Sequence, residues 1–380
     1  MTSDTMPLVA PIEIQCPPVL RFGGATAPTV GDWAREQGCS RVLVVADAFN
    51  AGRVEKLALP GTPTVFGAVK PEPDIPNLQA LLDMAETARP DLVVGFGGGS
   101  AMDLAKLAAV LPGSGQSIHD VVGPEKVRSR ETALVQVPTT SGTGSEAGTR
   151  ALVTDPATQN KLAVQSRHML ADLAVVDPDL TLTVPPAVTA ATGVDALAHC
   201  TEAYTSRRAH PLIDLYALEG IRLIGRFLGR AVRDGRDREA RAGLALASLY
   251  GGFCLGPVNT TAGHAVAYPL GTRHHLPHGL TCALIYPHTL AFNACAAEAK
   301  TARILEALNV RGTTDEAGVR DAAHGFCAAL GLEMRLSRHG VPGSDLPAMA
   351  AEAHTIRRLL DNNPREIGQD DILALYRAAF

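Results

Sequence analysis

The sequence predicts two domains of different class, an α/β domain with a mostly parallel sheet over residues 1–185 and an all-helical domain over residues 186–380. Two observations support this division. In the first half, short apolar runs alternate with helical segments, which is typical of a parallel sheet covered by helices. After about residue 180, strand signals become sparse and long stretches rich in Ala and Leu predominate. The length of 380 residues also fits two domains.

Four runs of β-branched and apolar residues predict strands buried on both faces, at 41–46, 91–95, 133–137 and 173–177. The second run leads into a glycine cluster, after which residues 100–110 have helical periodicity with Ser100 as the expected N-cap. In the second half we expect helices at 187–205, 210–230, 237–254, 281–296, 314–330, 345–360 and 368–379. Pro185 and Pro186 mark the expected domain boundary.

Composition excludes several classes of partner. The chain has 34 Lys and Arg against 39 acidic residues, a net charge of -5, without the basic excess that nucleic acids or anionic membranes require. The seven cysteines are scattered and form no CxxC pair, so a disulfide scaffold and a cysteine-based zinc site are both disfavoured. There is no N-terminal leader pattern and no long uninterrupted apolar run. We therefore expect a cytoplasmic protein with no nucleic-acid or membrane partner.

The glycine cluster lies where a strand ends and a helix begins. Gly97, Gly98 and Gly99 lack Cβ atoms, and with Ser100 they would let the backbone approach a pyrophosphate at a helix N-terminus. The cluster is not a strict G-x-G-x-x-G fingerprint, so an ordinary glycine-rich turn between strand and helix is the alternative.

Two further segments of the first half could contact a nucleotide. The loop 138–146 carries Thr139, Thr140 and Thr143 directly after a strand, which suits a second phosphate or ribose contact or, alternatively, a capped turn. Asp47 ends another strand, where its carboxylate could accept hydrogen bonds from ribose hydroxyls and repel a 2′-phosphate. The alternative for Asp47 is a helix cap or an Asx-turn.

The helical half contains a candidate metal site. Asp195 and His199 are four residues apart, so on a helix they share one face. His264 and His278 follow fourteen residues apart. One carboxylate and three imidazoles form a donor set suited to Fe²⁺ or Zn²⁺. Any one of these histidines taken alone also fits a capping or surface position.

A series of motifs in order resembles the iron-containing, group III alcohol dehydrogenases. The segments are GGGSAMDLAK (97–106), PTTSGTGSE (138–146), GVDALAHCTEAY (193–204), GHAVAYPLGTRHHLPHGLTCALIYPHTLAFN (263–293) and the ending NPREIGQDDILALYRAA (363–379). The resemblance extends over essentially the whole chain. It implies a dinucleotide-binding α/β domain joined to an all-α metal-binding domain, as in the dehydroquinate synthase-like architecture.

The resemblance also implies site residues, position by position. The implied metal ligands are Asp195, His199, His264 and His278. The implied cofactor contacts are Gly97, Gly98, Gly99, Ser100 and Asp103 at the pyrophosphate, Thr139, Thr140 and Thr143 in the cofactor cleft, Lys161 at the nicotinamide ribose, and Asp47 where NAD is selected over NADP. Cys200 and Cys282 lie beside the ligand segments, but the metal is expected on Asp and His.

The function implied is reversible NAD(P)-linked hydride transfer between an alcohol and its aldehyde or ketone, with the substrate oxygen at a divalent metal. The expected cofactors are NAD rather than NADP, and Fe²⁺ with Zn²⁺ as the other candidate. The expected assembly is a homodimer or larger. Alternatives are a metal-independent reductase of the maleylacetate reductase kind, a lyase of the dehydroquinate synthase kind, and a non-catalytic NAD-binding protein.

One candidate catalytic residue departs from the family pattern. Tyr268 stands four residues after His264, where many members have a second histidine close to the nicotinamide and the substrate. A tyrosine hydroxyl can donate a hydrogen bond, but its pKa is ordinarily about 10. The path of the proton is therefore left open by the sequence.

Overall fold

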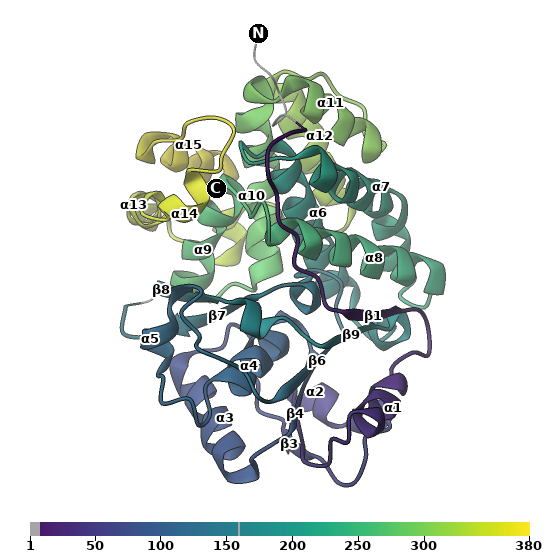
Figure 1. Cartoon of the computed structure of the whole chain (residues 1–380). Coiled ribbons are helices and arrows are strands. Elements are labelled where there is room, and N and C mark those ends of the chain that lie inside the picture. The colour runs from purple at the N-terminus through teal and green to yellow at the C-terminus, as the bar shows by residue number, and fades with distance from the viewer. Residues whose placement is uncertain (1–7, 159) are drawn as a thin grey trace. The chain divides into compact units, whose positions relative to one another are not determined.

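The computed structural model describes residues 8–158 and 160–380, which form two compact units (Figure 1). The α/β unit contains Gln15–Thr140 and Gly144–Leu182. The helical unit contains Thr183–Phe380, Ser141–Thr143 and the described part of the N-terminal segment up to Ile14. The chain therefore leaves the α/β unit after Thr140, contributes Ser141–Thr143 to the helical unit, and re-enters the α/β unit at Gly144.

A six-stranded parallel sheet organises the α/β unit. Its strands, in spatial order, are β1 (Val19–Phe22), β9 (Leu173–Val176), β6 (Ala133–Pro138), β4 (Leu92–Gly97), β2 (Val42–Val45) and β3 (Thr64–Phe66). Every neighbouring pair is parallel. The predicted mostly parallel sheet is confirmed, and the four predicted runs correspond to β2, β4, β6 and β9.

Helices pack on both faces of this sheet, and successive residues of a strand contact opposite faces. Leu43 and Val45 of β2 belong to a hydrophobic cluster with α3 (Ile75–Ala88) and α4 (Gly99–Val110). Val42 and Val44 belong to a second cluster with α1 (Thr29–Glu36). Because successive side chains of a strand point to opposite faces, a strand with helices on both sides is mainly apolar on both faces, and the buried Gln136 of β6 is the exception among the predicted runs. This is why the runs show no polar alternation.

The α/β unit also contains elements that the sequence did not predict. β5 (Gly123–Pro124), β8 (Asn160–Gln165) and β7 (Arg150–Asp155) form a small sheet in which β7 and β8 are antiparallel. The remaining short elements are α2 (Ala48–Ala51), α5 (Ile118–Val121) and the 3₁₀ turns η1 (Val54–Leu57), η2 (Ser145–Ala147), η3 (Arg167–Met169) and η4 (Pro178–Thr181).

The expected N-cap of the helix after the glycine cluster was wrong. The cap of α4 is Gly98, which is extended with φ −77° and ψ −173°, and Ser100 lies inside the first turn. Glycine supplies no side-chain oxygen to accept the first amide N–H groups. The N-terminus of α4 therefore has no capping side chain.

In the described part of the chain, all strands belong to the α/β unit and the other unit is helical. Its helices are α6 (Pro186–Thr205), α7 (Pro211–Arg233), α8 (Arg238–Leu255), α9 (Ala262–His274), α10 (His278–Asn293), α11 (Glu298–Ala307), α12 (Glu316–Ala329), α13 (Leu346–His354), α14 (Arg357–Leu360) and α15 (Gln369–Ala379), with 3₁₀ turns η5 (Ala294–Ala296), η6 (Leu336–His339) and η7 (Gly343–Asp345). Across the described residues, none of the helices has the length and apolarity needed to cross a membrane.

The predicted helices differ from the observed ones at several places. The expected helix 281–296 begins earlier, so that His278 is the first residue of α10. The expected helix 345–360 is interrupted and becomes η7, α13 and α14. Helices α9 and α11 were not predicted, and α9 carries both Pro269 and an almost wholly buried sequence from Ala262 to Leu270. A helix buried on every side has no amphipathic periodicity to detect.

Two hydrophobic clusters form the core of the helical unit, and α10 belongs to both. Ala283, Tyr286 and Leu290 of α10 pack in a cluster with α6, α7 and α8. Leu284 and Ile285 of the same helix pack in a second cluster with α9, α13 and α15. Helix α10 is therefore the shared wall between the two clusters.

Candidate functional site

The candidate metal centre begins on α6. Asp195 and His199 lie one turn apart on this helix, in a stretch that is buried from Gly193 to Thr205. His199 Nε2 lies 3.8 Å from Asp195 Oδ1, and His199 Nδ1 lies 3.3 Å from the carbonyl oxygen of Gly142. A carbonyl only accepts hydrogen bonds, so this contact places the proton of a neutral His199 on Nδ1. The lone pair of Nε2 is then directed toward the Asp195 carboxylate.

Two further histidines reach the same carboxylate oxygen from other helices. His264 of α9 places Nε2 3.4 Å from Asp195 Oδ1, and His278 at the start of α10 places Nε2 3.6 Å from it. The rings of His199 and His264 are stacked, with centroids 4.6 Å apart. The structure therefore brings together all four predicted metal ligands around one oxygen atom, from three helices of one unit.

The donor atoms of this cluster fit a divalent cation. Asp195 Oδ1 and His264 Nε2 are fully buried and have no hydrogen-bond partner among the described residues. A buried polar atom without a partner is costly, and a bound ion removes that cost at both atoms. His278 is the most accessible of the four, with 24% of its side chain exposed.

The electrostatics of the site also favour a positive charge. Burial alone would raise the pKa of Asp195, but His199, His278 and His264 together hold it well below its ordinary value. Burial lowers the pKa of His199 to about 4, despite the opposing effect of Asp195. An ionised carboxylate beside neutral imidazole is the protonation state that a metal ligand requires.

Glu202, which sequence reasoning missed, lies behind His264. Its Oε1 accepts a 2.6 Å hydrogen bond from His264 Nδ1, and its Oε2 accepts bonds from the backbone N–H and the hydroxyl of Thr261, at 2.6 and 3.1 Å. Burial would raise the pKa of Glu202, but His264 and the Thr261 N–H lower it overall. Glu202 is one turn along α6 from His199 on the same side, and that spacing was a usable signal.

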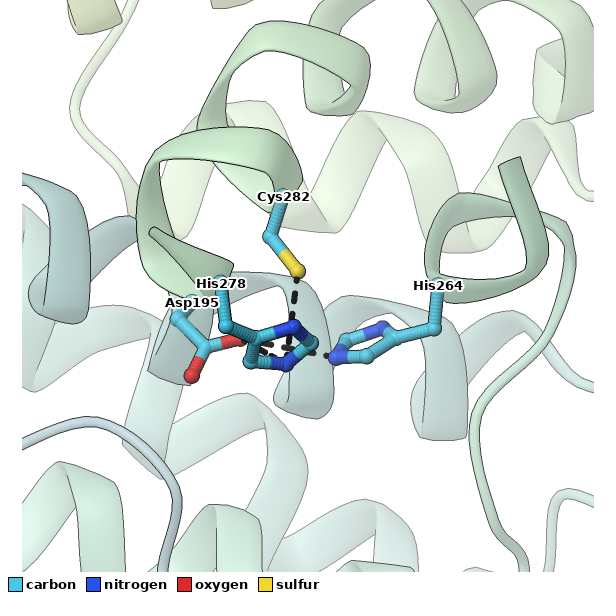
Figure 2. A group of neighbouring side chains, drawn as sticks. All are labelled: Asp195, His264, His278 and Cys282. Carbon is cyan, nitrogen blue, oxygen red and sulfur yellow. Dashed lines mark hydrogen bonds and ion pairs between the residues drawn. The ribbon is translucent and has the colours of Figure 1, made fainter. Parts of the chain in front are cut away.

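Cys282 is the second residue that the sequence prediction did not include in the site. Figure 2 shows its sulfur directed toward the cluster formed by Asp195, His264 and His278. The Sγ atom lies 3.7 Å from His278 Nε2, and one donor atom from each of these four residues lies within 4.8 Å of the others. His278 and Cys282 are four residues apart on α10, the same spacing as Asp195 and His199.

Tyr268 lies at the edge of the cluster. Its ring centroid is 6.1 Å from that of His278, and its hydroxyl accepts a 3.5 Å hydrogen bond from Arg358 of α14. Burial would raise the pKa of Tyr268, but Arg358, His264 and His278 lower it overall. The tyrosine is thus a buried hydroxyl next to a candidate ligand, with a guanidinium that favours its ionised form.

In the α/β unit, several predicted cofactor residues gather at the glycine turn. A Cβ atom at Gly97 would lie 2.8 Å from Ala101 Cβ, and one at Gly98 would lie 3.3 Å from Thr140 Oγ1. The residues Gly97, Gly98, Gly99 and Ser100 connect β4 to α4. Only glycine fits at position 97, so the backbone itself lines the turn, as binding of a pyrophosphate requires.

Asp47 lies at this turn and also caps a helix. Its Oδ1 accepts hydrogen bonds from the N–H groups of Phe49 and Asn50, at 2.9 and 3.0 Å. The Asn50 side chain links Asp47 Oδ2 to Thr139 Oγ1, at 2.7 and 3.2 Å. A Cβ atom at Gly97 would be 3.5 Å from Asp47 Oδ2. The cap alternative is therefore present in the structure, and the carboxylate is still placed beside the turn.

Three predicted cofactor residues have other surroundings. Asp103 accepts hydrogen bonds from Ser145 Oγ and Leu152 N, at 2.7 and 2.9 Å, and so holds α4 to the start of β7. Lys161 of β8 forms an ion pair with Glu72. Neither contact includes the glycine turn. Thr143 belongs to the segment that groups with the helical unit.

A parallel α/β unit with a glycine turn, and a buried Asp–His cluster, are features of a metal-dependent, nucleotide-linked oxidoreductase. Comparison with known proteins gives the family. Residues 17–178 match the iron-containing alcohol dehydrogenase family, and residues 189–380 match the C-terminal part of the Fe-containing alcohol dehydrogenase family. The chain belongs to the iron-containing alcohol dehydrogenases, which confirms the resemblance and the enzyme class expected from the sequence.

Individual relatives are similar over nearly their whole length. Long-chain-alcohol dehydrogenase 1 of Geobacillus thermodenitrificans is 35% identical, with 97% of this chain and 96% of that protein aligned. A solved structure of a 1,3-propanediol oxidoreductase has a TM-score of 0.92 at 30% identity and covers 98% of this chain and 100% of its own. Sulfoacetaldehyde reductase of Bifidobacterium kashiwanohense, solved in complex with NAD+, has a TM-score of 0.87 at 29% identity and covers 97% and 99%.

Proposed function

We propose that this chain catalyses reversible hydride transfer between NAD and a small alcohol or its carbonyl product, with Asp195, His199, His264 and His278 holding a divalent metal ion. One observation carries the proposal. Three imidazole nitrogens from three helices approach a single buried oxygen of Asp195, at 3.4 to 3.8 Å. The orphaned Asp195 Oδ1 and His264 Nε2 support the same assignment.

The charge of the donor set suits the reaction. One carboxylate and three neutral imidazoles leave a divalent ion with a net charge of about +1, which favours negative charge on a nearby oxygen. A divalent ion held there supplies Lewis-acid chemistry toward the oxygen of an alcohol or a carbonyl. We propose Fe²⁺, in line with the family, while the same oxygen and nitrogen donors also suit Zn²⁺.

Asp47 supports NAD over NADP as the coenzyme. The glycine turn would hold the pyrophosphate with backbone N–H groups at the uncapped N-terminus of α4. The Asp47 carboxylate lies beside that turn, where it would accept hydrogen bonds from ribose hydroxyls and repel a 2′-phosphate. Thr139 and Thr140 flank the same turn, whereas Asp103 and Lys161 are held by partners outside it.

Tyr268 is our candidate for the proton path. Its hydroxyl is buried near His278 and is held by Arg358, which stabilises the phenolate form. A hydroxyl whose pKa is lowered toward neutrality exchanges protons with a bound alcohol more readily than an ordinary tyrosine. We therefore propose that Tyr268, rather than a histidine, relays the proton between the substrate and water.

The test is turnover before and after removal of the metal. Purified protein is stripped with a chelator, reloaded with Fe²⁺ or Zn²⁺, and assayed by nicotinamide absorbance over a panel of alcohols, aldehydes and oxo acids. We expect activity to be lost on stripping, restored on reloading, and absent in Asp195→Asn with either metal. Full activity in the stripped protein would contradict the metal role and favour a metal-independent reductase. Product formation without net NADH would indicate a lyase, and tight NADH binding without turnover a non-catalytic protein.

Two further expectations rest on the family resemblance alone. We propose a homodimer or larger assembly, which light scattering of the purified protein measures. We also propose the cytoplasm as the compartment, which fractionation of the source cells tests.

A further inference from the structure

Cys282 occupies the position of a metal ligand and not that of an ordinary buried cysteine. It lies one turn into α10, on the same face as His278, and only 3% of it is exposed. Its Sγ lies 3.7 Å from His278 Nε2, and it belongs to the group of four donor atoms that all lie within 4.8 Å of one another. Figure 2 shows the sulfur directed into the same space as the two imidazoles and the carboxylate.

The spacing of these atoms is that of donors sharing one ion. Two atoms bound to one ion at about 2.0 to 2.3 Å, with an angle of about 90° to 120° between them, lie roughly 2.8 to 4.0 Å apart. The distances of His264 Nε2 and His278 Nε2 from Asp195 Oδ1 are 3.4 and 3.6 Å, and the sulfur distance from His278 is 3.7 Å. The Cys282 sulfur therefore lies about as close to one proposed ligand as the proposed ligands lie to one another.

A neighbouring cysteine provides the contrast within the chain. Cys200 directly follows His199 and is also buried, but it lies in the apolar cluster of α6, α7 and α8. Its sulfur lies 4.0 Å from the carbonyl oxygen of Ala247. It does not belong to the group of donor atoms around Asp195. Two cysteines beside the ligand segments therefore differ, one directed into the core and one into the donor cluster.

We propose that Cys282 is a fifth ligand, a thiolate that binds the same metal ion as Asp195, His199, His264 and His278. The inference rests on the metal site of the proposed function and adds a sulfur donor to it. On binding, the S–H bond breaks, the proton passes to solvent, and a sulfur–metal bond forms with no change of oxidation state. The thiolate lowers the net charge of the loaded site from about +1 to about zero, and it favours thiophilic ions over hard ones.

The experiment uses cobalt as an optical probe of the intact protein. The chelator-stripped chain is titrated with Co²⁺, and its spectrum is recorded for the wild type, Cys282→Ser and the matched variant Cys200→Ser. Visible ligand-field bands report that cobalt is bound, and a near-ultraviolet thiolate-to-cobalt band reports a sulfur ligand. We expect the visible bands and the near-ultraviolet band in the wild type and in C200S. In C282S we expect the visible bands to remain and the near-ultraviolet band to be lost.

The outcomes separate this inference from the proposed function. Visible bands without a near-ultraviolet band in the wild type, or a near-ultraviolet band that persists in C282S, would overturn the sulfur ligand and leave the metal site intact. Failure of the wild type to bind cobalt at all would overturn both. If C282S does not fold, X-ray absorption of the zinc-loaded wild type decides the matter. A sulfur neighbour at about 2.3 Å supports the proposal, and a shell of oxygen and nitrogen alone refutes it.

Discussion

The carboxylate of Glu202 accepts a 2.6 Å hydrogen bond from Nδ1 of His264, on the side of the ring away from the metal-ligand cluster. In a neutral His264 this bond places the proton on Nδ1 and leaves the lone pair of Nε2 directed toward Asp195. Glu202 is itself held by the N–H and hydroxyl of Thr261. The orientation of His264 therefore depends on a residue that does not face the proposed ion.

We predict that Glu202→Gln weakens metal binding by about 10- to 100-fold, the usual effect of removing a carboxylate that supports a ligating histidine. The amide cannot accept from both His264 and Thr261 with the strength of an ionised carboxylate. The measurement is the dissociation constant for Zn²⁺ by competition with a chromogenic chelator. Glu219→Gln, on an exposed side chain of α7, is the control. Equal affinities in the two variants would show that Glu202 has no positioning role.

Gly263→Ala should also weaken metal binding, because the new methyl group would displace the Glu202 carboxylate. A Cβ atom at this position would lie 2.5 Å from Glu202 Oε1, so the carboxylate that holds His264 must move. Gly256→Ala is the matched control, because a Cβ at Gly256 has nothing within 4 Å. We expect weaker Zn²⁺ binding in G263A and no change in G256A, measured by the same competition. Retention of full affinity in G263A would mean that the carboxylate can shift without releasing the imidazole.

We predict that Asp47→Ser raises the kcat/KM for NADP by at least about tenfold relative to NAD, because placing a phosphate beside a carboxylate costs several kcal/mol. Serine retains an oxygen that can cap α2. The control is Asp74→Ser, which changes the N-cap of α3 in the same unit. Steady-state kinetics with both coenzymes decide the matter. An unchanged preference in D47S would remove Asp47 from coenzyme selection.

The raised pKa of Glu146 should make the stability of the protein depend on pH. Burial raises the pKa of this carboxyl from 4.5 to about 7. Between those pH values the unfolded chain releases its proton while the folded chain keeps it, so stability falls as the pH rises through this window. The loss is complete above pH 7 and amounts to about 3 kcal/mol at most.

The variant Glu146→Gln removes this loss because its side chain is always neutral. We expect the melting temperature of E146Q to gain on the wild type between pH 5 and pH 8, measured by thermal denaturation in matched buffers. Glu86→Gln changes an exposed carboxyl on α3 and should track the wild type at both values. Parallel curves for E146Q and the wild type would mean that Glu146 is ionised in the folded chain at pH 5.

Much of the fold was visible in the sequence because burial imposes patterns. The strands β2, β4 and β9 are apolar throughout because helices cover both faces of the sheet, and β6 is apolar apart from the buried Gln136. The bounds of α6 were predicted to within a residue. The paired spacing of Asp195 and His199 on that helix identified one side of the site. The family resemblance supplied the functional roles, whereas the residue pattern supplied only the donor types.

The remaining features depend on packing that no local pattern encodes. Helix α9 is buried on nearly every side and contains Pro269, so it shows neither amphipathic periodicity nor good helix propensity. Gly98, and not Ser100, caps α4 because the backbone stays extended there. Glu202 and Cys282 acquire their importance only when α6, α9 and α10 come together, although both stand at helical spacing from a predicted ligand.

The arrangement of the ligands has a mechanical consequence. Asp195 belongs to α6 in one hydrophobic cluster, His264 to α9 in the other, and His278 to α10, which both clusters share. An ion bound to all three would link the two clusters across the helical unit, in addition to the packing along α10 and the hydrogen bonds of Glu202 to Thr261 and His264. Its binding free energy would then be added to the resistance of the whole unit to heat. Loss of the metal would thus lower the thermal stability of the protein as well as its activity.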